Sequence, residues 1–177
     1  MGKDYFKITI GKPVLGEEQD IVEVIKKTWL STYPNKKYKI NRKDILSRDF
    51  DSAKKINRWS RLIKNNEKSK YLCVAKHENK IVGVCLVSKK KNFNELNVIY
   101  ILPKYQKMGI GKKMLNKSIG WLGNEKNIFV KAVSYNQNAI DFYENYGFSK
   151  MDRQGNISFL LNGKVVPETK LVMKTVK

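Results

Sequence analysis

Two short stretches of the chain combine residue types that could carry out chemistry. The first, residues 106–111, reads Gln-Lys-Met-Gly-Ile-Gly and lies between a run of β-branched and aromatic residues and an amphipathic helical pattern. A glycine-containing turn that leads into a helix presents free amide N–H groups and the positive end of the helix dipole to an anion. The turn is therefore a candidate anion-binding site, formed by Gln106, Lys107, Met108, Gly109, Ile110, Gly111 and Lys112.

The spacing of the glycines excludes two familiar phosphate-binding loops. A P-loop needs the run G-x-x-x-x-G-K followed by serine or threonine, and the sequence contains no such run. The dinucleotide fingerprint G-x-G-x-x-G begins at Gly109 and Gly111 but meets Met114 where its third glycine belongs. By itself the turn could equally be a plain connection between a core strand and a helix.

The second stretch, residues 136–148, reads Asn-Gln-Asn-Ala-Ile-Asp-Phe-Tyr-Glu-Asn-Tyr-Gly-Phe and follows a short predicted strand. Asn136 is a residue type that caps helix N-termini, and Gly147 stands where a helix C-terminal glycine belongs, so a helix is predicted between them. Tyr143 in this helix carries a phenol with an ordinary pKa of about 10, a group that can donate a proton. The alternative for Tyr143 is a core aromatic side chain on one face of the helix.

Together the two stretches resemble the signatures of one protein family. A strand, Pro103, Q-x-x-G-x-G and a helix, followed after a further strand by N-x-x-A-I-x-F-Y-x-x-x-G-F, are similar to the two motifs of the GCN5-related N-acetyltransferase (GNAT) superfamily, in the same order. The resemblance covers roughly residues 5–176. It implies an enzyme that transfers the acetyl group of acetyl-CoA (coenzyme A as carrier) directly to a primary amine.

The resemblance also implies roles for individual residues. The turn after Pro103 would bind the cofactor pyrophosphate through its amides, and Asn136 and Asn138 would contact the cofactor from the second motif. Pro103 marks where the preceding strand is expected to part from its neighbour, and Tyr143 would lie beside the cofactor sulfur as general acid. Three residues of that strand would pair with the pantetheine arm, namely Ile99, Tyr100 and Ile101. Ile99 and Ile101 would equally serve as core residues, and Asn136 as a helix cap.

The general base is predicted by the same comparison. Members that acetylate the N-termini of ribosomal proteins place a glutamate on the strand before the second motif, where this chain has Lys131, which is cationic at neutral pH. Glu95, at the start of the central strand, matches an acidic position in other members and is the predicted base, acting directly or through water. Glu95 could instead be an exposed charge at a strand end, with the amine losing its proton to solvent.

The acceptor is predicted to be a small amine or a polyamine. In this fold the first two helices wall the acceptor side, and here that region carries Glu17, Glu18 and Asp20 together with aromatic residues, a combination that holds cationic amines. Trp29 and Tyr33, which resemble the spermidine/spermine acetyltransferase-like branch, are the predicted substrate-binding residues. The acids could also be charges that favour a helix N-terminus. Protein N-termini or lysines are the alternative acceptors.

The elements that must position these residues follow from hydrophobic patterns and turn residues. The expected order is β-α-α-β-β-β-α-β-α-β-β, an α/β arrangement that the resemblance identifies as a GNAT fold, with a mixed, mostly antiparallel sheet of about seven strands and helices on both faces. One domain over residues 1–177 is expected. Strands are predicted at residues 5–10, 71–76, 80–89, 96–102, 128–133, 156–161 and 170–176, and helices at 17–30, near 42–48, 52–64, from 111, and 136–146. Turns are predicted at His77-Glu78-Asn79 and Asn162-Gly163, with a loop at Pro167.

The net charge of +20 raises the question of a nucleic-acid partner, since lysine neutralises phosphates. Only five of the 36 basic residues are arginine, the residue that reads bases and phosphates bidentately, and the lysines are spread along the chain. We therefore expect dispersed surface charge without a nucleic-acid partner, and a field that favours arrival of a polyanionic cofactor. A non-catalytic module that binds acyl-CoA or nucleic acid is the alternative function, and a homodimer, common among relatives, stays open.

Cysteine, histidine and hydropathy patterns bound the remaining possibilities. Cys73 and Cys85 lie on the arms of a predicted hairpin around His77, and this set is too small for a zinc site, so no metal is expected. The longest apolar runs, such as residues 81–87, are too short to span a bilayer, and the N-terminus lacks a secretory pattern. A cytoplasmic protein with reduced core cysteines and no membrane partner is the expectation.

Overall fold

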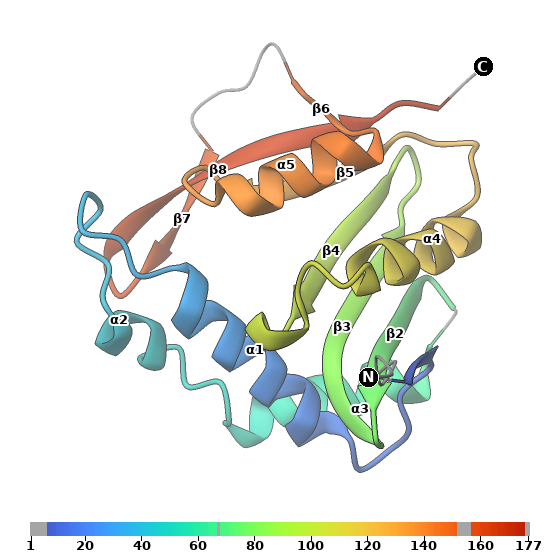
Figure 1. Ribbon diagram of the computed structural model, residues 1–177, viewed down its shortest axis with the longest axis horizontal. Coiled ribbons are helices and arrows are strands. Elements are labelled where there is room, and N and C mark those ends of the chain that lie inside the picture. The colour runs from blue at the N-terminus through green and yellow to red at the C-terminus, as the bar shows by residue number, and fades with distance from the viewer. Residues whose placement is uncertain (1–6, 67, 152–156, 176–177) are drawn as a thin grey trace, which may run out of the picture.

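The computed structural model describes residues 7–66, 68–151 and 157–175. Within them an eight-stranded sheet runs in the order β1-β2-β3-β4-β5-β8-β6, with β7 paired to β8 (Figure 1). The strands are β1 (Ile8–Gly11), β2 (Lys70–His77), β3 (Lys80–Lys89), β4 (Asn94–Ile101), β5 (Ile128–Val133), β6 (Ser149–Lys150), β7 (Ile157–Leu161) and β8 (Lys164–Met173). Among the described strands, β4 and β5 form the one parallel pair. The predicted fold class is confirmed, and residues 5–6, 156 and 176 of the predicted strands lie outside the described residues.

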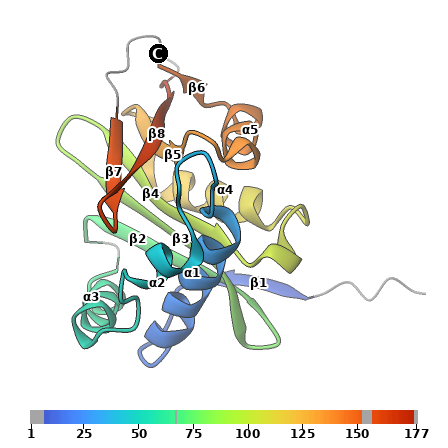
Figure 2. The same ribbon diagram turned by 90° about the vertical axis from the view of Figure 1, so that its left-hand side faces the viewer.

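Helices cover both faces of the sheet, as predicted (Figure 2). The helices are α1 (Glu18–Thr32), α2 (Arg42–Leu46), α3 (Ala53–Lys64), α4 (Ile110–Leu122) and α5 (Gln137–Tyr146), with a short 3-10 turn at Pro103–Tyr105. On one face α4 and α5 bury residues such as Met114, Leu115 and Ile140, and on the other face α1 buries Ile21 and Val24. None of the described helices is long and apolar enough to cross a membrane.

The parallel strands β4 and β5 pair over only three residues before they diverge. Their register runs from Asn94 opposite Ile128 to Leu96 opposite Val130, and beyond Leu96 no described residue of β4 pairs with β5. At the same point β4 carries a bulge, because Val87 of β3 lies opposite Leu96 and Leu86 lies opposite Val98. A bulge bends its strand and increases the local twist, which turns β4 away from β5. The prediction that the strands part at Pro103 is therefore wrong, and Figure 1 shows the two strands diverging.

The first hairpin turns one residue later than predicted. His77 is the last residue of β2 and lies opposite Lys80, and its Nδ1 is 3.0 Å from the hydroxyl of Tyr105. The turn itself consists of Glu78 and Asn79, which have φ angles of 48° and 65°. Two positive φ angles are typical of the two-residue hairpin turn that matches strand twist. The paired strands place Cys73 opposite Cys85, so the expected cross-strand neighbours are confirmed.

The hairpin of β7 and β8 contains the predicted Asn162-Gly163 turn, with φ angles of 49° and 74°. Pro167, predicted in a loop, lies within β8 opposite Ser158. Its carbonyl accepts a hydrogen bond from the N–H of Ser134, just past the end of β5. The missing N–H of proline therefore falls where the β5 ladder stops, a position in a strand that proline can occupy.

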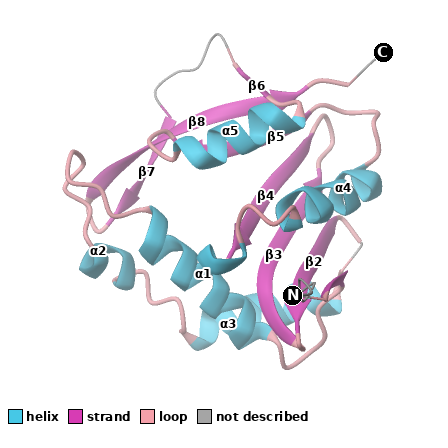
Figure 3. Ribbon diagram, in the orientation of Figure 1, coloured by secondary structure: helices cyan, strands magenta, loops and turns pink. Residues whose placement is uncertain are grey.

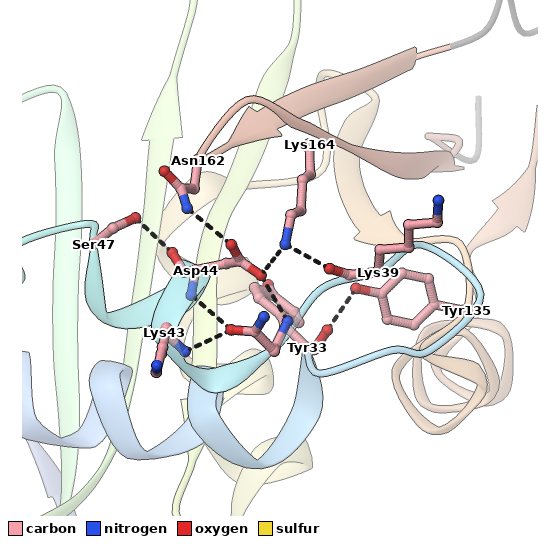
Figure 4. Close-up of polar contacts among 9 residues, drawn as sticks. Tyr33, Lys39, Lys43, Asp44, Ser47, Tyr135, Asn162 and Lys164 are labelled. Atoms are coloured by element: carbon pink, nitrogen blue, oxygen red, sulfur yellow. Dashed lines mark hydrogen bonds and ion pairs between the residues drawn. The ribbon is translucent and has the colours of Figure 1, made fainter.

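A buried carboxylate joins this hairpin to α2 (Figure 4). Asp44 is 2% exposed, and its oxygens accept hydrogen bonds from Asn162 Nδ2 at 2.9 Å and Lys164 Nζ at 2.6 Å. Asp44 also accepts the N–H of Asn41, whose own side chain caps α2 in return. The hydrogen bond from Lys164, with those from Asn162 and Asn41, holds the pKa of Asp44 at about 2, below its usual 3.8.

Asp44 should make stability depend on pH in the acid range. Because its pKa falls from 3.8 to about 2 on folding, its contribution to stability is complete above about pH 4 and is lost as the pH falls through 2. The melting temperature of Asp44→Asn should therefore lie below that of the wild type at about pH 6 and approach it at about pH 2. Thermal unfolding followed by circular dichroism at stepped pH measures both. A difference that stays constant across this range would contradict the linkage.

Candidate functional site

A cavity of about 1060 Å³ opens where β4 and β5 part, and both sequence motifs line it. Its wall comes from the end of α1, from β4 and the turn that follows it, and from β5 and α5. Of the residues predicted to bind cofactor or substrate, those on the cavity wall are Ile99, Tyr100, Ile101, Gln106, Lys107, Gly109, Gly111, Lys112, Asn136, Asn138, Tyr143 and Tyr33. Residues 40 or more positions apart in the sequence are thus brought to one cavity.

The opened edge of β4 presents backbone polar groups to the cavity. The N–H of Leu102 donates to the carbonyl of Val82 on β3, at 2.9 Å. Since successive residues of a strand direct their N–H and C=O groups to opposite sides, those of Ile101 and Ile99 point away from β3 and into the gap. The carbonyl of Ile101 accepts a hydrogen bond from the side chain of Gln106, at 2.9 Å. Gln106 therefore has a structural task beside any contact with a ligand.

The turn after β4 leads through the 3-10 turn into α4 (Figure 3). Gly109 is the N-cap of α4, and the first intrahelical bond runs from Lys113 N–H to the Gly109 carbonyl. The N–H groups of residues 110–112 consequently have no acceptor within the helix. Lys107 and Lys112 lie on the cavity wall beside these amides, whereas Met108 is exposed and Ile110 is buried in the core. Amides, helix dipole and two lysines together make an anion site.

The two glycines of the turn are required for different physical reasons. Gly109 has a φ of 76°, a backbone conformation that residues with a side chain adopt at a cost, and an added Cβ would meet nothing within 4 Å. Gly111 has an ordinary helical backbone, but a Cβ there would lie 3.2 Å from both the Ile101 side chain and the Phe142 ring. The first glycine thus shapes the turn, and the second lets α4 approach β4 and α5.

Tyr143 presents a neutral phenol to the cavity. Its side chain is buried, with 6% exposure, and its ring packs edge-on against Phe142 and Phe148 at centroid distances of 5.4 and 5.7 Å. Its hydroxyl makes no hydrogen bond to any other residue that the structure describes, and Tyr143 lines the cavity. Burial raises the pKa of Tyr143 far above its usual value, which keeps the phenol protonated but makes it a weaker acid than a free phenol. A thiolate that left beside it in the same desolvated cavity would be more basic for the same reason.

Asn136 caps α5, as the sequence alternative proposed. Its side chain accepts a hydrogen bond from the N–H of Ala139, at 3.2 Å. Asn136 and Asn138 both line the cavity, so their predicted contact with a cofactor stays a prediction.

Tyrosines form the end of the cavity nearest α1. The hydroxyls of Tyr33 and Tyr100 lie 3.3 Å apart, and Tyr135 donates its hydroxyl to the carbonyl of Tyr33 at 2.8 Å (Figure 4). Trp29 does not line the cavity; it packs behind Tyr33 with a ring distance of 4.4 Å, and the guanidinium of Arg48 covers its ring. Tyr135 was missed in the sequence, where its position directly before the capping Asn136 was the available signal.

The predicted acids lie elsewhere. Glu95 is opposite Ser88 on β3 and Phe129 on β5, and it is not on the cavity wall. Glu17 accepts the N–H of Val14 and pairs with Lys76, and Glu18 accepts the N–H of Gly16 and the hydroxyl of Ser60. Both are therefore engaged around the start of α1, in line with the alternative, and neither lines the cavity. Among the described residues of the wall, the one carboxylate is Asp141.

Comparison with known proteins identifies the family. Residues 26–148 match the family described as Acetyltransferase (GNAT) family. The chain belongs to the GNAT family. The predicted class of enzyme and its cofactor, an acetyltransferase that uses acetyl-CoA, are those of this family. The described residues contain no group of three or more His, Cys, Asp or Glu side chains that could hold a metal ion.

Solved GNAT structures share the fold at low sequence identity. The PaiA N-acetyltransferase of Thermoplasma acidophilum, solved in complex with coenzyme A, has a TM-score of 0.72 and 19% identity over 93% of this chain and 99% of that one. A GCN5-related N-acetyltransferase of Rhodopseudomonas palustris has a TM-score of 0.68 and 16% identity over 95% of each chain. N-alpha-acetyltransferase 50 of Danio rerio is 32% identical over 77 residues, which are 41% of this chain. The match spans 46% of that relative, about half its length.

The residues present fit the cofactor of the GNAT family. The turn offers amides that α4 does not use, the position of a Gly109 side chain is open space, and the neighbouring charges are Lys107 and Lys112. These are the groups that a pyrophosphate requires. The opened edge of β4 offers N–H and C=O groups in the extended conformation that a pantetheine arm could pair with.

Two glycines of α4 provide a matched test of the packing at the turn. At Gly120, which has nothing within 4 Å of an added methyl group, alanine should raise the free energy of unfolding by about 1 kcal/mol. At Gly111 the same helical gain is opposed by contact with the Phe142 ring at 3.2 Å, so Gly111→Ala should be no more stable than the wild type. Urea unfolding of the two variants measures this. Equal stabilisation of both would show that Gly111 is not crowded.

Proposed function

We propose that this protein is an acetyl-CoA-dependent N-acetyltransferase that transfers an acetyl group directly to a primary amine. The observation that carries the proposal is one cavity that is lined by the amide-bearing turn, by the opened edge of β4 and by Tyr143. A binding module without catalysis would need the turn but not a buried phenol free to donate a proton. The proposal therefore favours an enzyme over a sensor.

The residues divide the work between binding and proton transfer. Acetyl-CoA, when bound, supplies a thioester whose carbonyl carbon an amine can attack. The turn amides with Lys107 and Lys112 would hold the pyrophosphate, and the N–H and C=O groups of Ile99 and Ile101 would align the pantetheine arm. Tyr143 would give its phenolic proton to the leaving sulfur as the new C–N bond forms and the C–S bond breaks, and would then be reprotonated from water.

The attacking amine must lose a proton, and the cavity wall supplies no evident base for it. Glu95 lies off the wall, and the one described carboxylate on it, Asp141, accepts a hydrogen bond from Gln137 at 2.6 Å. We therefore propose that the amine arrives neutral or gives its proton to solvent, and that Glu95 is not a direct base.

For the acceptor we favour a small monoamine over a polyamine. The charged residues on the described wall are Lys107, Lys112, Lys131 and Asp141. A cavity with a positive surplus repels the second and third charges of a polycation, and the phenols near Tyr33 offer hydrogen bonds but no negative charge. A peptide N-terminus is the second candidate, favoured by the similarity to N-alpha-acetyltransferase 50.

Removing the phenolic proton should slow the chemical step. Tyr143→Phe is expected to lower kcat by about a hundredfold, because proton donation to the leaving group contributes factors of this order. Tyr146, on the same helix, also lines the cavity, but its hydroxyl donates to Asn116 of α4, so Tyr146→Phe should change kcat by no more than about twofold. Glu95→Gln should likewise keep kcat. Release of free thiol from acetyl-CoA in the presence of amine measures all three, and an active Tyr143→Phe would remove Tyr143 from the mechanism.

An acceptor panel tests the function itself. With acetyl-CoA saturating, a small monoamine should give a higher kcat/KM than spermidine, because the lysines on the wall repel a polycation. A short peptide with a free N-terminus tests the second candidate in the same assay. If spermidine gave the highest kcat/KM, the proposed acceptor would be wrong. If thiol release were no faster with any amine than without one, the proposed acetyltransferase activity would be wrong.

A further inference from the structure

The acceptor end of the cavity depends on a loop, residues 33–41, that joins α1 to α2. Tyr33 begins this loop and lies on the cavity wall. The loop is held together internally by reciprocal backbone hydrogen bonds between Asn35 and Ile40, at 2.8 and 3.0 Å. The ring of Tyr38 stacks on that of Tyr135 at 5.2 Å, so the loop rests on the connection between β5 and α5.

Each end of the loop is anchored to the half of the sheet beyond the cavity. At its start, Tyr135 donates its hydroxyl to the carbonyl of Tyr33 at 2.8 Å. At its end, Lys164 of the β7–β8 hairpin donates to the carbonyl of Lys39 at 2.7 Å and to Asp44 at 2.6 Å (Figure 4). The loop therefore bridges from α1, which packs against β3 and β4, to elements on the β5 side of the gap.

Asp44 is the centre of the second anchor. Both carboxylate oxygens are engaged, one by Asn162 and the other by the Asn41 N–H and by Lys164. The side chain of Asp44 is almost wholly enclosed, since its side-chain exposure is 3% against 33% for Lys164. Removing a partner from such a cluster leaves polar groups without their bonds, and these groups would move to recover them.

We propose that Asp44 is a positioning residue for the acceptor: it holds the loop against the hairpin so that Tyr33 stays at the end of the cavity. This inference rests on the proposed function, because it concerns the amine that the cavity accepts. Within the described part of the chain, the hydrogen bonds of the Asp44 cluster do not extend to the turn after β4 or to Ile99 and Ile101, and the link from Tyr33 to β4 is the contact with the Tyr100 hydroxyl. Loosening the cluster should therefore weaken binding of the amine and leave binding of acetyl-CoA unchanged.

The experiment compares Asp44→Asn and Lys164→Met with a second ion pair. Lys26 and Asp51 lie 2.7 Å apart, link α1 to the chain just before α3 and do not line the cavity, so Asp51→Asn controls for losing a more exposed ion pair elsewhere. KM is measured for the best small amine of the acceptor panel at saturating acetyl-CoA, and for acetyl-CoA at saturating amine. Circular dichroism at the assay temperature confirms that each variant is folded, and if one variant does not fold the other carries the test.

The two cluster variants are expected to raise the amine KM by about tenfold while the acetyl-CoA KM changes by less than about twofold. Asp51→Asn should leave both unchanged. If the wild type transfers no acetyl group, the proposed function fails and the inference with it. If the wild type is active but the folded cluster variants keep the amine KM, or raise both KM values alike, only the inference is wrong.

Discussion

The structure depends on one interruption of backbone pairing, the point after Leu96 where β4 leaves β5. A strand inside a sheet normally has its N–H and C=O groups satisfied on both sides, and buried groups without partners are costly. One of these backbone groups is satisfied within the protein, because the side chain of Gln106 donates a hydrogen bond to the carbonyl of Ile101. The rest of the opened edge faces the cavity. A gap of this kind is stable only if solvent or an extended ligand supplies the missing partners, which makes the parting both the weak point of the sheet and the origin of the site.

Packing, rather than sequence proximity, couples the two motifs that line this gap. Gly111 of the first motif lies against the ring of Phe142 of the second, with space for a hydrogen atom but not comfortably for a methyl group. Consecutive residues of a helix point about 100° apart, so seating the Phe142 ring against Gly111 turns Tyr143 to a different side of α5, and both residues line the cavity. The position of the phenol is therefore fixed by a contact that involves no catalytic atom. Gly111 of the first motif therefore packs together with Phe142 and Tyr143 of the second.

Much of this arrangement could be predicted from local patterns, because each motif carries its own cap, glycine and hydrophobic period. The turn, the helices after it and the Asn162-Gly163 hairpin are of this kind. What failed depended on pairing between distant strands: the bulge opposite Leu86 and Val87 moves the parting point six or more residues ahead of Pro103. Pro167 lies inside a strand because the neighbouring ladder ends there, which only the register reveals. Glu95 and Trp29 were given their predicted roles because they match positions in relatives. Whether a side chain lines the cavity or packs behind its wall depends on strand twist and packing, which such a match does not reveal.

Charge links the selection of donor and acceptor. With a net charge of +20, the protein attracts a polyanion from solution, and the lysines beside the turn continue that field into the cavity. The same field opposes any polycation, and the two carboxylates at the start of α1 do not offset it at the cavity, because Glu17 pairs with Lys76 and Glu18 accepts a hydrogen bond from Ser60. At the proposed acceptor end, Tyr33, Tyr100 and Tyr135 form a wall that is polar but uncharged. Such a wall can recognise an amine by hydrogen bonding once the amine is neutral, which is also the only form able to attack a thioester. The absence of a carboxylate on this part of the described wall therefore does two things: it withholds a base, and it avoids stabilising the protonated, unreactive form of the acceptor.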